Sequence, residues 1–153
     1  MGYANLRSGR CSVDGQVYLV TFHTAGRRPH FLDVAMAFEA SRVMTSALTW
    51  PKSRLVAWVL MPDHWHGLIE LHDEPLGLCV ARLKALSTKA LRQVFSSRMA
   101  VWAPGFHDRA LRRSEHIESA ARYLLMNPVR AGLVTKAGNY AFWNASWLDE
   151  AHG

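Results

Sequence analysis

The hydrophobic residues of this 153-residue chain fall into short segments with two different repeats. Runs rich in β-branched and aromatic residues, bounded by turn-forming residues, are typical of strands. Segments in which apolar residues recur every three or four positions are typical of amphipathic helices. Runs of the first kind predict strands at residues 16–23, 55–61, 64–71 and 106–111. Segments of the second kind predict helices at residues 31–48, 76–99 and 115–127.

The order of these elements predicts the fold class. The first six follow the order β-α-β-β-α-β, which is that of the ferredoxin-like split βαβ arrangement. We therefore expect an α+β fold with a central antiparallel sheet, whose first and third strands are central, plus a C-terminal helix. The turn-forming pair Pro62-Asp63 joins the second and third strands into a hairpin. Pro128 should end the last helix, because the residue before a proline disfavours helical geometry.

The same periodicity predicts which helical residues face the core. In the first helix these are Leu32, Ala35, Met36, Phe38, Val43 and Leu48, and in the second they are Leu83, Leu86, Ala90 and Val94. The length of the chain is that of one domain, residues 1–153. Within it, residues 1–15 form a basic arm, and residues 135–153 form a tail whose aromatic segment packs back on the body.

Charge and cysteine content narrow the class of protein. The net charge is +6 and the isoelectric point is about 9.8, which favours a polyanionic partner such as nucleic acid, although a merely basic protein stays open. No apolar run approaches the ~20 residues of a membrane span. The two cysteines are far apart in sequence and form no CxxC pair, so we expect neither a disulfide framework nor a cysteine zinc site, and a reducing cytoplasm.

Basic residues without acidic neighbours occupy the second helix. Residues 76–100 contain five basic residues and no acidic one. Spacings of seven and three place Arg82, Lys89 and Arg92 on one helical face. Further basic residues crowd the segment that follows, at Arg109, Arg112 and Arg113. We expect these six side chains to contact phosphates.

The third strand opens with His64-Trp65-His66, which is the first candidate site. Side chains alternate along a strand, so the two histidines share one face and the tryptophan takes the other. Two imidazoles on one face of a rigid strand are suited to bind one divalent metal ion. The alternative is a pair of half-buried histidines that only make hydrogen bonds.

The last helix carries the second candidate site. Tyr123 and Asn127 are four residues apart and so project from the same helical face. The phenol can act as a nucleophile, and the amide oxygen suits a hard divalent ion. Each also has a structural alternative, because tyrosines commonly pack on helices and asparagine before proline commonly ends one.

Four segments together resemble the REP-associated tyrosine transposases, a branch of the single-tyrosine HUH transposases. They are G-R-C-S-V-D-G-Q-V-Y-L-V-T-F near the start, L-M-P-D-H-W-H, W-A-P-G-F-H-D-R-A-L-R and Y-L-L-M-N-P-V-R-A-G-L-V. The resemblance runs from about Gly9 to Trp147. The H-x-H pair alone is a weak signal, whereas its combination with Y-x-x-x-N-P-V-x-A-G-L-V is a specific one.

The resemblance implies a reaction and the residues that perform it. His64 and His66 match the metal-binding pair, and Tyr123 matches the nucleophile. Asn127 stands where many HUH transposases have glutamine as the third ligand, so this match is less direct. The implied activity is metal-dependent cleavage and rejoining of single-stranded DNA at palindromic REP elements, with Mg²⁺ or Mn²⁺, through a 5′-phosphotyrosine, by a monomer or homodimer.

Two other functions remain open on the sequence. One is a regulator of the same fold that binds single-stranded nucleic acid without cutting it, for which the basic helix and interleaved aromatics would suffice. The other is a metal-dependent hydrolase that activates water, with Tyr123 as a structural residue. A covalent protein–DNA adduct distinguishes the transposase from both.

Overall fold

The computed structural model describes residues 15–96, 98–112 and 116–151. Most of the predicted basic arm, and Arg113, lie outside these residues. No helix in the described part is both long and apolar enough to cross a membrane.

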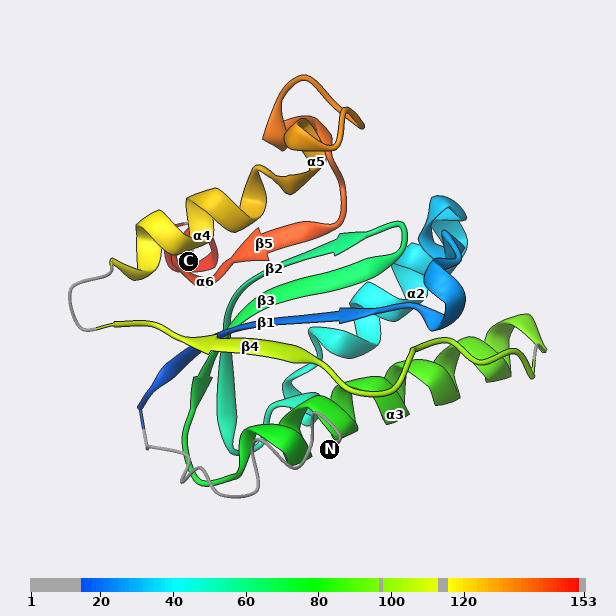
Figure 1. Ribbon diagram of the computed structural model, residues 1–153, viewed down its shortest axis with the longest axis horizontal. Helices are drawn as coiled ribbons and strands as arrows, with labels where there is room; N and C mark the ends of the chain where they lie inside the picture. The colour runs from blue at the N-terminus through cyan, green and yellow to red at the C-terminus, as the bar shows by residue number, and fades with distance from the viewer. Residues whose placement is uncertain (1–14, 97, 113–115, 152–153) are drawn as a thin grey trace.

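A five-stranded antiparallel sheet forms the centre of the structure (Figure 1). Its strands are β1 (Val17–His23), β2 (Ser53–Met61), β3 (His64–Leu71), β4 (His107–Ala110) and β5 (Trp143–Ala145). Their spatial order is β4-β1-β3-β2-β5. The predicted α+β class, the β-α-β-β-α-β order and the central position of the first and third strands are therefore confirmed.

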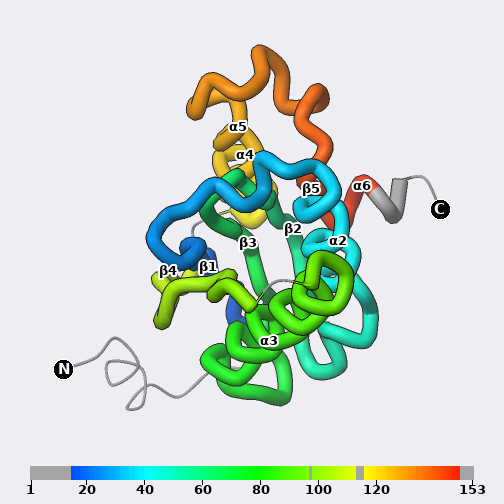
Figure 2. The backbone as a smooth tube through the Cα atoms, turned by 90° about the vertical axis from the view of Figure 1, so that its right-hand side faces the viewer, coloured from blue at the N-terminus to red at the C-terminus, as the bar shows by residue number. Residues whose placement is uncertain are grey.

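Helices cover both faces of this sheet (Figure 2). The helices α2 (Val34–Met44) and α3 (Leu76–Phe95) pack on one face, where Val20, Phe22 and Trp65 belong to their core cluster. The helix α4 (Ile117–Leu125) packs on the other face, against Val59 and Leu68. The short α5 (Asn127–Arg130) follows α4, and 3₁₀ turns lie at residues 25–27, 30–32, 47–49 and 137–139.

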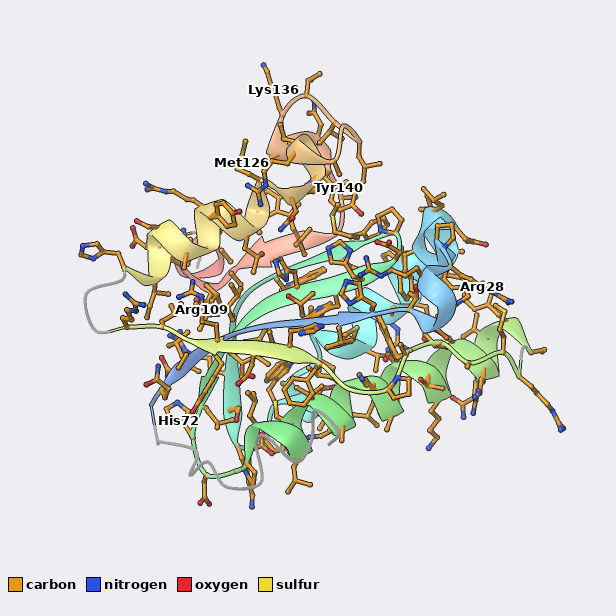
Figure 3. The ribbon with its side chains drawn as sticks, viewed as in Figure 1. Arg28, His72, Arg109, Met126, Lys136 and Tyr140 are labelled. Atoms are coloured by element: carbon orange, nitrogen blue, oxygen red, sulfur yellow. The ribbon has the colours of Figure 1, made fainter. Side chains whose placement is uncertain are left out.

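The C-terminal tail contributes a strand to the sheet. β5 pairs with β2 as an added edge strand, and α6 (Ser146–Ala151) follows it. Tyr140 lies between the preceding loop and the sheet, and Lys136 projects outward from that loop (Figure 3). The Tyr140 hydroxyl donates a hydrogen bond of 2.6 Å to the Leu60 carbonyl.

The first predicted helix is too long, and most of its predicted core residues are wrong. Asp33 caps α2 by accepting from the amides of Ala35 and Met36, so the helix begins at Val34. The buried residues of α2 are Ala37, Ala40 and Met44, whereas Leu32, Ala35, Phe38 and Leu48 are exposed. α2 packs closely on α3, and small side chains allow that approach.

The other two helices also end earlier than predicted. α3 ends at Phe95 because Ser96 adopts a left-handed conformation, with φ 51°. The predicted core residue Val94 in its last turn is exposed, whereas Ser87 and Leu91, which were not predicted to face the core, are buried. α4 ends at Leu125, and Pro128 lies in the first turn of α5, where its missing N–H has no helical partner to lose.

Candidate active site

The two histidines of the H-x-H motif lie on β3, the middle strand of the sheet. His64 stands opposite His23 on β1 and Met61 on β2, and His66 stands opposite Thr21 and Val59. Paired residues point to the same face, so both imidazoles lie on the face that α4 covers, and their ring centroids are 5.8 Å apart. The predicted division of the histidines and the tryptophan between opposite faces is correct.

Trp65 anchors this strand from the opposite face. It is fully buried and stacks on Phe22, with ring centroids 5.1 Å apart. Its ring lies across the backbone of Gly67, where an added Cβ would come within 2.2 Å of the indole. Glycine at this position therefore allows the tryptophan to lie flat along β3, directly behind the histidines.

Each imidazole is oriented through its Nδ1 atom. The His64 Nδ1 lies 2.8 Å from the Asp63 carboxylate oxygen, and the His66 Nδ1 is hydrogen-bonded to the Thr21 hydroxyl. The remaining nitrogen, Nε2, is then the one available to a ligand on both rings. Fixing the tautomer of a ligating histidine through its second nitrogen is a general feature of metal sites. The pair thus has the chemistry of two metal ligands.

Burial keeps His66 in its neutral form. Desolvation, and then the charge of His64, lower the pKa of His66 to about 4. A neutral imidazole retains the lone pair that a metal ion requires. His66 can therefore act as a ligand throughout the neutral pH range.

Two further histidines lie beside the pair. The His23 ring centroid is 5.5 Å from that of His64 and 6.3 Å from that of His107 on β4. Sequence reasoning did not find them, because only the strand register places His23 opposite His64. Within the described residues, no three histidine, cysteine, aspartate or glutamate side chains form a group that could hold a metal ion.

Tyr123 lies in the last turn of α4, and its side chain is 65 % exposed. α4 contacts β2 and β3, on the face that carries the histidines. The other described tyrosines are placed differently: Tyr18 packs with the core of the opposite face, and burial raises the pKa of Tyr140 to about 12. Of these three tyrosines, Tyr123 is the one that is exposed and lies on the helix covering the histidine face.

Asn127 follows Tyr123 after a break in the helix. It begins α5, with Met126 between the two helices (Figure 3). Its Nδ2 donates 2.8 Å to the Leu124 carbonyl at the end of α4, and the side chain is half-buried. Because the nitrogen of the amide is engaged in this way, its oxygen is the atom left to ligate.

Comparison with known proteins matches this arrangement to a family. The model of the family described as "Transposase IS200 like" matches residues 12–126, which include both histidines and Tyr123. The chain belongs to the IS200-like transposase family. Among solved structures, it is similar to a REP-associated tyrosine transposase bound to a REP hairpin, with a TM-score of 0.70 and 22 % identity over 94 % of this chain and 84 % of that one.

A second solved structure shares the fold of this transposase. It is a putative transposase from Deinococcus radiodurans, with a TM-score of 0.50 and 22 % identity, covering 78 % of this chain and 95 % of the other. The comparison with curated proteins gave no match. The family and the fold expected from the sequence are thus confirmed, and the roles of single residues stay predictions.

Not every basic residue of this transposase is available to DNA. Arg82 is paired with the buried Glu74 carboxylate, with an Nη1 to Oε2 distance of 2.8 Å, and Arg82 Nη2 bonds the same oxygen. Glu74 lies just before the segment 76–100, which has no acidic residue, so the pattern of that segment does not indicate this ion pair. Lys84 is likewise engaged, donating 2.9 Å to the Ala103 carbonyl. The geometry argues against a phosphate contact by Arg82.

Lys89 and Arg92 have a more open position. Both line a groove of the transposase between α3 and residues 100–104, together with Thr88 and Trp102. Arg109 lies on the histidine face of β4, since its partner on β1 is Leu19, two residues from Thr21 (Figure 3). Arg112 is exposed just beyond β4. Lys89 and Arg92 therefore lie on the α3 side of the sheet, and Arg109 lies on the histidine face.

Proposed function

We propose that this chain cleaves and rejoins single-stranded DNA at REP-type palindromes, through a covalent bond between Tyr123 and a 5′-phosphate. The observation that carries this proposal is the pair of oriented imidazoles on β3 beneath the helix that bears an exposed tyrosine. Family membership supports a DNA-processing reaction. The solved relative that holds a REP hairpin supports hairpin DNA as the substrate class.

Cleavage and rejoining would both proceed through Tyr123. The Tyr123 oxygen attacks the scissile phosphorus, the bond from phosphorus to the 3′ oxygen breaks, and that oxygen leaves as a 3′-hydroxyl after taking up a proton. The DNA remains attached to Tyr123 as a 5′-phosphotyrosine. The reverse attack by a 3′-hydroxyl restores the phosphodiester and releases the tyrosine. No external energy source is needed, because one phosphodiester replaces another.

His64, His66 and Asn127 would hold the divalent ion, Mg²⁺ or Mn²⁺. Two imidazole nitrogens and one amide oxygen would leave positions on the ion for water and phosphate oxygens. When bound, the ion polarises the scissile phosphate and offsets its charge as the new bond forms. Asp63 and Thr21 hold the two rings in place for it.

The basic residues would bind the strand away from the reacting phosphate. Among the described residues, we assign phosphate contacts to four of the predicted basic side chains. They are Lys89 and Arg92 in the groove, and Arg109 and Arg112 near β4. Trp102 lines the same groove and offers an aromatic face for base stacking.

The experiment is incubation with a single-stranded REP-type hairpin oligonucleotide and Mg²⁺ or Mn²⁺, followed by a denaturing gel. A cleaved strand and a protein–DNA adduct are expected, both absent for Tyr123→Phe and both present for Tyr140→Phe. Chelation should abolish both products. Cleavage without an adduct would support a hydrolase, and binding without cleavage would support a regulator of this fold.

A further inference from the structure

Arg130 is packed against the proposed nucleophile. Its guanidinium carbon lies 4.1 Å from the centroid of the Tyr123 ring. Its Nη2 also donates a hydrogen bond of 2.7 Å to the Tyr123 carbonyl. Tyr123 belongs to α4 and Arg130 is the last residue of α5, so the arginine reaches back across the helix break at Met126.

These two contacts restrain both ends of the tyrosine. The cation over the ring favours one orientation of an otherwise exposed side chain, and the hydrogen bond fixes the guanidinium relative to the backbone that carries it. An attacking group that is already oriented loses less conformational freedom on the way to the transition state.

The guanidinium also lies beside the place where the attacked phosphate must be. Its carbon is 4.1 Å from the centroid of the Tyr123 ring, and the scissile phosphorus has to come within bonding distance of the phenol oxygen on that ring. A phosphate held there for attack must therefore lie near this cation.

We propose that Arg130 positions Tyr123 for attack and binds the scissile phosphate. This inference rests on the proposed cleavage reaction. Within the described part of the chain, its hydrogen bond to the Tyr123 carbonyl is the one that the guanidinium makes, so further N–H groups can meet phosphate oxygens while its face stays on the ring. The planar fork of arginine suits this double use, which a lysine ammonium cannot reproduce.

The first test compares Arg130→Gln and Arg130→Lys with Arg122→Gln as a matched control. Arg122 precedes Tyr123 on α4 and is exposed, so its replacement removes the same charge from the same region. At saturating hairpin DNA, single-turnover cleavage by Arg130→Gln should slow by about 10²-fold or more. Arg130→Lys should recover part of this loss, and Arg122→Gln should stay within a few-fold of wild type.

DNA affinity separates positioning from simple charge loss. The two glutamine variants should weaken hairpin binding by similar factors, while only Arg130→Gln loses the cleavage rate. If both variants cleave equally fast, the catalytic part of the proposal is wrong.

A second test needs neither DNA nor catalysis. The protein is labelled with 3-fluorotyrosine, and the ¹⁹F resonance of position 123 is assigned with Tyr123→Phe. Arg130→Gln should shift that resonance and leave those of Tyr18 and Tyr140 in place, and Arg122→Gln should shift none of the three. An unmoved resonance in Arg130→Gln would refute the positioning role. If Arg130→Gln shifts the Tyr123 resonance as expected but the wild-type protein fails to cleave DNA, the proposed function is wrong instead.

Discussion

At the scale of single residues, the two histidines of the H-x-H motif have different surroundings. His64 lies beside the turn carboxylate Asp63, whereas His66 is more deeply placed, with Thr21 as its partner. Burial holds the pKa of His66 at about 4, against an ordinary value of 6.5. The spacing of the motif showed that both rings share a face, but not that their environments differ.

The lowered pKa of His66 predicts how stability depends on pH in the metal-free protein. The folded state keeps this ring neutral, while the unfolded chain takes up a proton below about pH 6.5. The contribution of His66 to the free energy of unfolding is therefore complete above pH 6.5 and is lost as the pH falls towards 4. The loss has an upper limit of roughly 3 kcal/mol.

Urea denaturation with a chelator, at pH 7.5 and pH 4.5, measures this effect. Wild type should lose more unfolding free energy between the two pH values than His66→Gln, and other histidines contribute to both proteins alike. Equal losses in the two proteins would show that His66 titrates normally in the fold.

At the scale of elements, β3 depends on the fit between Trp65 and Gly67. We predict that Gly67→Ala lowers the free energy of unfolding by about 1–3 kcal/mol or more, because the rigid buried indole must move to admit a methyl group. The shift should also disturb the two histidines behind it and weaken metal binding.

Gly77→Ala is the matched control for this change. Gly77 lies in the first turn of α3, where an added Cβ meets no atom within 4 Å. Alanine is the better helix former, so this variant should be neutral or stabilised by up to about 1 kcal/mol. Chemical denaturation measures the free energy of unfolding of both variants. Equal values for the two variants would contradict the role given to Trp65.

The basic residues of α3 should behave differently from one another. Lys89→Gln and Arg92→Gln should each weaken binding to any single-stranded DNA. Each should also make the slope of log K against log salt concentration shallower by roughly 0.7. Arg82→Gln should instead lower stability, by about 2–4 kcal/mol, because it leaves the Glu74 carboxylate buried without its partner.

Salt titrations of single-stranded DNA binding, paired with thermal melts, distinguish these outcomes. If Arg82→Gln instead made the slope of log K against log salt concentration shallower and left stability unchanged, Arg82 would be a phosphate contact.

The limits of prediction from sequence are visible in these same elements. Strands β1 to β4 were predictable because alternation and turn residues are local signals, whereas β5 was not among the predicted strands. The buried side of α2 was not, because Ala37 and Ala40 face inward only as a result of packing on α3. The ion pair of Arg82 was not predictable from the pattern of the helix, because its partner Glu74 precedes that helix. The clustering of His23 with His64 depends on strand register, which no single segment encodes.

At the scale of the whole molecule, α4 packs on β2 and β3 of its own chain. This supports a site completed within one chain, with Tyr123 serving the histidines beneath it. We predict that a mixture of Tyr123→Phe and His66→Ala proteins regains no cleavage on the denaturing gel. Recovery of activity in the mixture would show that the tyrosine of one copy serves the histidines of another.

The two edges of the sheet have a consequence for how copies of this protein can meet. β4 has four residues and includes Asp108 and Arg109, and β5 has three. Short edge strands with charged side chains are poor templates for backbone pairing between molecules. The sheet therefore cannot readily extend from one molecule into the next, which protects the exposed backbone from aggregation. The described edges of the sheet thus favour contacts between copies through side chains over contacts through paired strands.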